Sequence, residues 1–145
     1  MQNNLSFCLV VPTQDQIKTL YELLNQRKYD ISNFTKISIN EHESFVKSKP
    51  YRTWYIVYKS NREIGSFYLS TANTIGINLI DSINIQTIES IIKYVKKNYK
   101  PLPEIKSFRA GKFSINVSPN NELLKKVIEE LGFKSVQISY FLDKK

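Results

Sequence analysis

The stretch from Asn116 to Phe133, NVSPNNELLKKVIEELGF, constrains the fold more than any other part of the chain. The alternating residues 113–118 indicate a strand, and Pro119 then blocks further strand pairing. Asn120 and Asn121 can cap a helix by offering side-chain acceptors to its free amides. The run therefore predicts a strand that leads directly into a capped helix.

The predicted helix has one apolar face and a glycine stop. Gly132 suits the left-handed position just past a helix end, and Phe133 can fold back on Ile128. The apolar positions recur with helical spacing: Leu123, Leu124, Val127, Ile128 and Leu131. A strand that leads into a helix through an exposed asparagine is a place where a ligand can bind.

This segment resembles the C-terminal signature of the GNAT superfamily of N-acetyltransferases. In that family a hydrophobic strand, an asparagine at the helix start and a Leu-Gly-Phe helix end precede the last strands. Counting back from Gly132, Asn121 matches the family asparagine, so the resemblance implies that Asn121 lies beside the pantetheine arm of acetyl-CoA. From the residues alone, Asn121 is equally well explained as a helix cap.

The order of predicted elements extends this resemblance over nearly the whole chain. The implied fold is α/β (α+β), with a central mixed, mostly antiparallel sheet of about seven strands flanked by about four helices, in a single domain over residues 1–145. The pattern predicts, in order, a strand (5–11), a helix opened by a Thr13–Gln16 capping box, a short helix started by Asn40 and Glu43, three strands (53–59, 63–71 and 74–80), a helix (85–95), the strand–helix unit described above, and a last strand pair (135–142).

The composition is that of a soluble globular protein and excludes few functional classes. Cys8 is the single cysteine and is expected to be buried in the first strand; it allows no internal disulfide, and with His42 as the one histidine no zinc cluster is expected. No apolar run reaches the roughly 20 residues of a membrane helix, and the N-terminus does not resemble a signal peptide, so a reducing cytoplasm is the expected location.

The net charge of +8 is compatible with nucleic acid, an anionic cofactor or no charged ligand. The lysines are scattered, and the chain has no arginine-rich arm or aromatic-basic ribonucleoprotein pattern. Nucleic-acid binding is therefore the less favoured interpretation.

The resemblance implies acetyl-CoA as cosubstrate, but the expected phosphate cradle is altered. The family cradle is a glycine-rich loop after the fourth strand, whereas the equivalent run here, DSINIQT at 81–87, contains no glycine. Ser82, Asn84 and Thr87 are the residues that could still serve a shortened cradle at a helix N-terminus. The acetyl oxygen is expected to contact main-chain groups at the end of the fourth strand, at Asn78, Leu79 and Ile80.

The catalytic acid and base are less clearly marked. The position where many family members carry an acidic tyrosine is Ile128 here, so Tyr140 or Tyr68 is the substitute, with aromatic packing as the alternative for both. His42 is the candidate base because its ordinary pKa, about 6.5, suits neutral pH; the alternative is a solvated histidine at a helix start. Its surroundings, Asn40-Glu41-His42-Glu43, are similar to a pattern in some sugar-modifying relatives.

Arg109 and Lys112 flank a glycine just before the signature strand and could bind a phosphate of CoA or of a nucleotide substrate. An ordinary basic turn explains them as well.

Together these features predict transfer of an acetyl group from acetyl-CoA to a primary amine by direct attack in a ternary complex, without a metal. The surroundings of His42 suggest an amino sugar or nucleotide-linked amino sugar as the acceptor. The main alternative is a binding protein of the same fold that has lost catalysis. Many family members are homodimers, but no apolar stripe in the sequence marks an interface.

Overall fold

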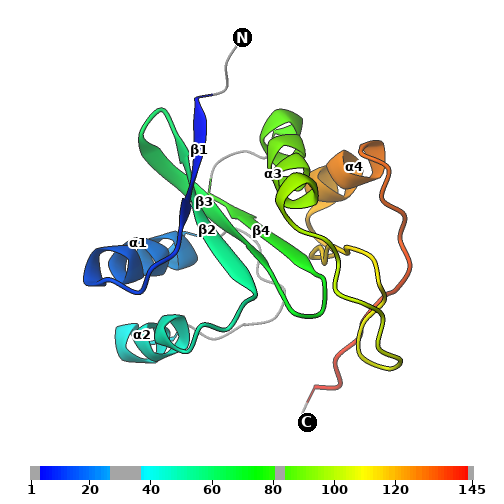
Figure 1. The fold of residues 1–145 in the computed structure, drawn as a ribbon, viewed down its shortest axis with the longest axis horizontal. Coiled ribbons are helices and arrows are strands. Elements are labelled where there is room, and N and C mark those ends of the chain that lie inside the picture. The colour runs from blue at the N-terminus through cyan, green and yellow to red at the C-terminus, as the bar shows by residue number, and fades with distance from the viewer. Residues whose placement is uncertain (1–3, 27–36, 81–83, 144–145) are drawn as a thin grey trace.

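The computed structural model describes residues 4–26, 37–80 and 84–143. In these ranges four strands form one antiparallel sheet in the order β1-β2-β3-β4, and four helices cover its two faces. Helices α1 and α2 lie on one side of the sheet and α3 and α4 on the other (Figure 1). The elements are β1 (Leu5–Leu9), α1 (Gln14–Asn25), α2 (Ile39–Lys47), β2 (Thr53–Lys59), β3 (Arg62–Leu69), β4 (Ile75–Leu79), α3 (Ile85–Asn98) and α4 (Glu122–Glu130).

Successive side chains of β2 point to opposite faces of the sheet, so this strand contributes to the core on both sides. Trp54, Ile56 and Tyr58 point to one face, where Ile56 is fully buried against α1 and α2. Tyr55 and Val57 point to the other face and pack beneath α3. The first core cluster consists of Ile17, Leu20, Leu23, Val46 and Ile56, and the second of Tyr55, Val57, Phe67, Leu69, Ile75, Ile91 and Val95.

The helix starts follow side-chain caps. The Thr13 side chain accepts a hydrogen bond from the Gln16 N–H, as predicted, while the Gln16 side chain accepts from the N–H of Val11. In α2 the capping box is formed by Ser38 and Glu41, so the helix begins earlier than the predicted start at Asn40.

The turn between β2 and β3 is a two-residue hairpin. Lys59 pairs with Arg62, and the two residues between them, Ser60 and Asn61, have φ values of 50° and 66°. Positive φ at both central positions is the pattern of the type I′ turn, whose twist matches that of the flanking strands. The predicted hairpins between the three central strands are confirmed.

The fold class is confirmed, but the predicted count of about seven strands is wrong for the described residues, where four strands form the sheet. The predicted strand at 113–118 is reduced to one parallel bridge, between Thr74 and Ser114. The predicted strand pair at 135–142 also forms no ladder: these residues follow α4 with their side chains in solvent. Alternation predicts an extended backbone, but a strand also requires a neighbouring strand.

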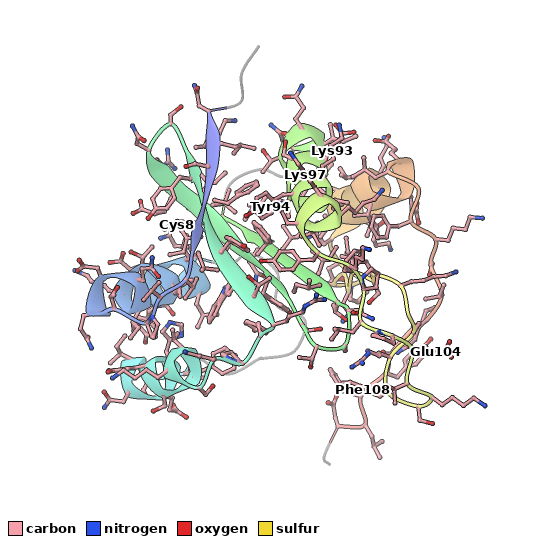
Figure 2. All side chains as sticks on the ribbon, in the orientation of Figure 1. Cys8, Lys93, Tyr94, Lys97, Glu104 and Phe108 are labelled. Carbon is pink, nitrogen blue, oxygen red and sulfur yellow. The ribbon has the colours of Figure 1, made fainter. Side chains whose placement is uncertain are left out.

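Cys8 is exposed, so the prediction of a buried thiol was wrong. It lies on the edge strand β1, of which only the face that carries Leu5 and Phe7 packs against the core. Figure 2 labels Cys8 on this strand and shows Tyr94 of α3 directed toward the sheet, where its ring contacts Phe7 at 5.1 Å between centroids. No described helix combines the length and apolar character needed to cross a membrane.

Candidate active site

The candidate site begins where β4 separates from the segment that follows Ser114. The two run parallel at Thr74 and Ser114, and Ile75 N–H donates to the Ser114 carbonyl at 2.7 Å. Beyond that point no described residue of 115–118 forms a ladder with β4. The edge of β4 is therefore paired at its start and has no ladder partner toward Leu79 in the part of the chain that the structure describes.

Ladder alternation shows which main-chain groups of β4 face this edge. Thr74 and Ile80 hydrogen-bond toward β3, through Ser70 and Ile64. In an antiparallel pair the bonds alternate, so the N–H and C=O groups of Ile77 and Leu79 point away from β3. Of the three predicted oxygen-binding positions, only Leu79 presents its main chain to the open edge. Asn78 and Ile80 present theirs to β3. Ile77 was not predicted, although counting ladder bonds from the β3–β4 turn would have identified it.

Along the chain, α3 follows β4 and α4 follows the segment that begins parallel to it, and both helices pack on one cluster with Ile77 and Leu79. The Asn84 side chain caps α3 by accepting from Thr87 N–H at 2.9 Å. The Asn121 side chain caps α4 by accepting from Leu124 N–H at 3.2 Å. The first amides of each helix have no acceptor within the helix and favour an anion. Asn84 and Thr87 thus form the cap of α3, and Asn121 forms the cap of α4.

The two caps differ in charge. The first turn of α3 carries no acidic side chain, whereas the first turn of α4 contains Glu122, whose carboxylate contacts the Lys125 ammonium at 3.2 Å. An anion is therefore better accommodated at α3. Asn121 itself is buried, so the prediction that it is exposed was wrong; the cap hydrogen bond holds its side chain against the helix.

An apolar cluster fills the space between β4 and the two helices. Ile128 of α4, the position where the resemblance leads one to expect a tyrosine, is buried in this cluster. Gly132 has φ of +100°, and Phe133 N–H donates to the Ile128 carbonyl at 3.1 Å, so the predicted glycine stop is confirmed. The buried members are Ile88, Ile92, Leu124, Val127 and Ile128, with Ile77, Leu79, Ile115, Val117, Leu131 and Phe133 packed around them.

Tyr68, one of the two predicted catalytic tyrosines, lies on β3 with its ring against β4. It pairs with Gly76, and a Cβ added at position 76 would lie 2.1 Å from the Tyr68 ring. The ring also stacks on Tyr51, with centroids 3.7 Å apart. Tyr140 lies after α4 with 86% of its surface exposed, and no strand among the described residues brings it to β4.

His42 is buried between α1 and α2, so the alternative of a solvated histidine was wrong. Its ring lies 5.3 Å from that of Tyr21, and neither ring nitrogen has a hydrogen-bond partner among the described residues. Burial lowers the pKa of His42 because it disfavours the charged imidazolium. The nearby backbone of Ile17 acts in the opposite direction and is the smaller of the two effects. A lowered pKa favours the neutral imidazole, which is the form that can accept a proton. The role of His42 as a base stays a prediction.

The predicted phosphate contacts lie at the other end of β4. Arg109 donates through Nε to the Pro103 carbonyl at 2.7 Å and through Nη1 to the Thr71 carbonyl at 3.2 Å. Thr71 precedes β4 in the chain. Its guanidinium thus fastens the 101–112 loop to the sheet. Lys112 is exposed near the same end. The structure does not bring either cation to the helix N-termini, and Ser82 lies outside the described residues.

No known family model matches this chain, and no curated protein sequence matches it either. Solved structures do match. Aminoglycoside N-acetyltransferase AAC(6')-Iy, in complex with CoA, is 12% identical with a TM-score of 0.64, over 100% of this chain and 97% of that chain. The spermidine/spermine N-acetyltransferase SpeG from Vibrio cholerae is 14% identical with a TM-score of 0.67, over 98% and 88%. An N-acetyltransferase from Staphylococcus aureus Mu50 is 14% identical with a TM-score of 0.64, over 97% and 92%.

These matches extend over almost the whole chain at very low sequence identity. The chain therefore has the fold of the GNAT N-acetyltransferases, as the sequence resemblance implied.

Proposed function

We propose that this protein transfers an acetyl group from acetyl-CoA to a primary amine of a small molecule. The observation that carries the proposal is the edge of β4, where the main-chain groups of Ile77 and Leu79 face away from β3 and α3 and α4 pack beside the strand. The N–H groups at this edge can donate to the thioester oxygen as it gains negative charge. Similar structures that act on aminoglycosides and spermidine support an amine acceptor.

The cofactor phosphates would bind at the N-terminus of α3. Asn84 and Thr87 form the cap there, and the absence of acidic side chains in the first turn suits an anion. Asn121 at the neighbouring cap is the residue proposed to contact the pantetheine arm. Because the equivalent loop contains no glycine, we expect weaker cofactor binding than a glycine-rich cradle would give.

The acceptor would approach from the sheet face that carries the side chains of Tyr68 and Asn78, opposite α3 and α4. Direct attack by the neutral amine on the thioester carbon breaks the carbon–sulfur bond, and the thiolate must then gain a proton. Tyr68, whose ring lies against Gly76 of β4, is the proposed donor in preference to Tyr140, which is exposed after α4. Amino sugars, including nucleotide-linked ones, are the first acceptors to test because of the residues around His42.

Calorimetry with CoA and acetyl-CoA tests the first step. Absence of binding at millimolar concentration would exclude the enzyme proposal. If CoA binds, thiol release is then followed with aminoglycosides, amino sugars, nucleotide-linked amino sugars, polyamines and peptides. A Cys8→Ser variant should be used, because the exposed native thiol would itself react with a thiol reagent.

A binding protein without catalysis is the second candidate, favoured by the buried Ile128 at the expected acid position. Binding of CoA with no turnover of any acceptor would support it. A basic nucleic-acid module would instead show salt-dependent retention on DNA or RNA that acetyl-CoA does not compete away.

A further inference from the structure

Four aromatic side chains from α2, β2, β3 and the 48–52 loop contact one another near β4. The Tyr51 ring stacks on the Tyr68 ring with 3.7 Å between centroids, and the Trp54 ring meets Tyr51 edge-on at 4.9 Å. Phe45 of α2 contacts both Tyr51 and Trp54, at 5.9 and 6.1 Å. Phe45 is 42% exposed and the other three are half-buried, so this aromatic group presents ring surface to a ligand.

The strand register places the aromatic group next to the proposed reacting edge. Trp54 pairs with Tyr68, and Tyr68 pairs with Gly76, so these three residues form one row on one face of the sheet. This is the face on which Trp54 packs against the core cluster of α1 and α2. Gly76 directly precedes Ile77, whose main-chain groups face away from β3. The aromatic group therefore lies on the side from which the acceptor would approach.

The elements that carry the aromatic group offer little negative charge. β2, β4 and the 48–52 loop contain no acidic residue. On α2, Glu41 belongs to the capping box, and the Glu43 carboxylate contacts the Lys47 ammonium at 2.6 Å. Glu63 is the second residue of β3, at the hairpin with β2. An acceptor with several ammonium groups is best bound by a set of carboxylates, so these elements favour an acceptor with a single amine.

Building on the acetyl transfer described above, we propose that the aromatic group binds the acceptor, and that the acceptor is a primary amine joined to an aromatic ring by a short alkyl chain. Edge-to-face and offset-stacked contacts of the ring with Phe45 and Tyr51 stabilise the complex in addition to the burial of apolar area. The short chain then carries the amine past Tyr68 toward the edge of β4. Sugars and linear polyamines have no ring to make these contacts.

The fluorescence of Trp54 measures this binding directly, because Trp54 is the single tryptophan of the chain and belongs to the aromatic group. Titration with phenethylamine should give a saturable change in its emission. Glucosamine and spermidine should bind at least about tenfold more weakly. Absence of a saturable change with phenethylamine, or tighter binding of either of the other amines, would overturn the inference.

Two exposed phenylalanines provide a matched pair of variants. Phe45→Ala removes one ring of the aromatic group and should weaken the binding of phenethylamine at least about fivefold. Phe108→Ala removes a ring that is 54% exposed on the 101–112 loop, and should leave this affinity within about twofold. Both variants should bind CoA with unchanged affinity in calorimetry, which checks that they are folded. Equal weakening of phenethylamine binding in the two variants contradicts a role for the aromatic group.

Thiol release in the Cys8→Ser background separates this inference from the proposed function. Phenethylamine should be acetylated with a kcat/KM at least about tenfold above the values for glucosamine and spermidine. Phe45→Ala should raise KM for phenethylamine more than it lowers kcat, because Phe45 contributes to binding and not to the chemical step. Binding of phenethylamine without transfer to any amine would overturn the proposed function. Transfer that favours glucosamine or spermidine would overturn this inference alone.

Discussion

The phenol ring of Tyr68 on β3 lies across the Cα atom of Gly76 on β4, so closely that a side chain at position 76 would overlap it. The absence of a Cβ at Gly76 allows the ring to cover β4, and the stack with Tyr51 on the same ring limits how far it can move. Packing at this point therefore sets the position of the proposed proton donor.

Gly76→Ala should displace the Tyr68 ring. We expect a loss of about 2 kcal/mol in the free energy of unfolding, as for overpacking in a filled site, measured by urea denaturation. Gly111→Ala is the matched control: the nearest atom to its added Cβ is 3.4 Å away, so the change should stay within about 0.5 kcal/mol. Equal stability of the two variants would show that Tyr68 is free to move.

Tyr68→Phe tests the chemical role separately from packing. The ring and its stack are kept and only the hydroxyl is removed, so stability should change by less than about 1 kcal/mol. If Tyr68 donates the proton, kcat should fall by about 100-fold or more while the affinity for CoA is unchanged. Tyr140→Phe should retain activity, and the opposite ranking of the two variants would assign the role to Tyr140.

The sequence predicted the helices and the central hairpins because their signals are local. Thr13, Asn84 and Asn121 mark helix starts, and Gly132 marks a helix end, all within a few residues. The segments 113–118 and 135–142 have the alternation of strands, but their pairing depends on a distant edge. Such pairing cannot be read from a local pattern.

The roles of the candidate site residues stay predictions, but the places of some of them in the fold follow from local signals. The side chains of Asn84 and Asn121 cap helices, and Thr87 N–H donates to the Asn84 cap. Arg109 was predicted as a phosphate ligand because of its charge, yet carbonyl groups of Pro103 and Thr71 hold it at the other end of β4. The burial of His42 depends on how α1 packs on α2, a contact that helical spacing alone does not determine.

His42 should make the protein less stable in mild acid. Its pKa is lowered in the folded state by burial, so the unfolded state binds the proton more readily. Its contribution is constant above the ordinary pKa, about 6.5, and stability is lost as the pH falls below that value. The loss cannot exceed about 1.4 kcal/mol per pH unit for one proton.

Denaturation at pH values from about 5 to 8 measures this effect. Because His42 is the single histidine in the chain, His42→Leu should flatten this part of the pH profile. The variant also removes two buried nitrogens without partners, so it should be as stable as the natural chain at neutral pH. An unchanged acid slope in His42→Leu would assign the slope to other groups.

Asn73 should be among the most sensitive polar positions. It is fully buried with φ of +68°, and its side chain donates to the carbonyls of Leu102 and Ala110 and accepts from Leu102 N–H. Asn73→Ala leaves these groups without partners, with an expected cost of about 3 kcal/mol. Asn61→Ala is the control, because Asn61 is exposed and has a similar φ of 66°. It should cost only about 1 kcal/mol, the penalty for placing alanine in a left-handed backbone conformation.

Asn121 allows capping and cofactor binding to be separated. Asn121→Ala should cost about 1 kcal/mol of stability because Leu124 N–H loses its acceptor, whereas Asn121→Ser keeps a capping oxygen and should cost less than about 0.5 kcal/mol. If Asn121 also contacts the pantetheine arm, both variants should bind CoA several-fold more weakly in calorimetry. Exposed Asn120 is the control, and Asn120→Ala should change neither quantity. Full CoA affinity in Asn121→Ser would limit Asn121 to its role as a helix cap.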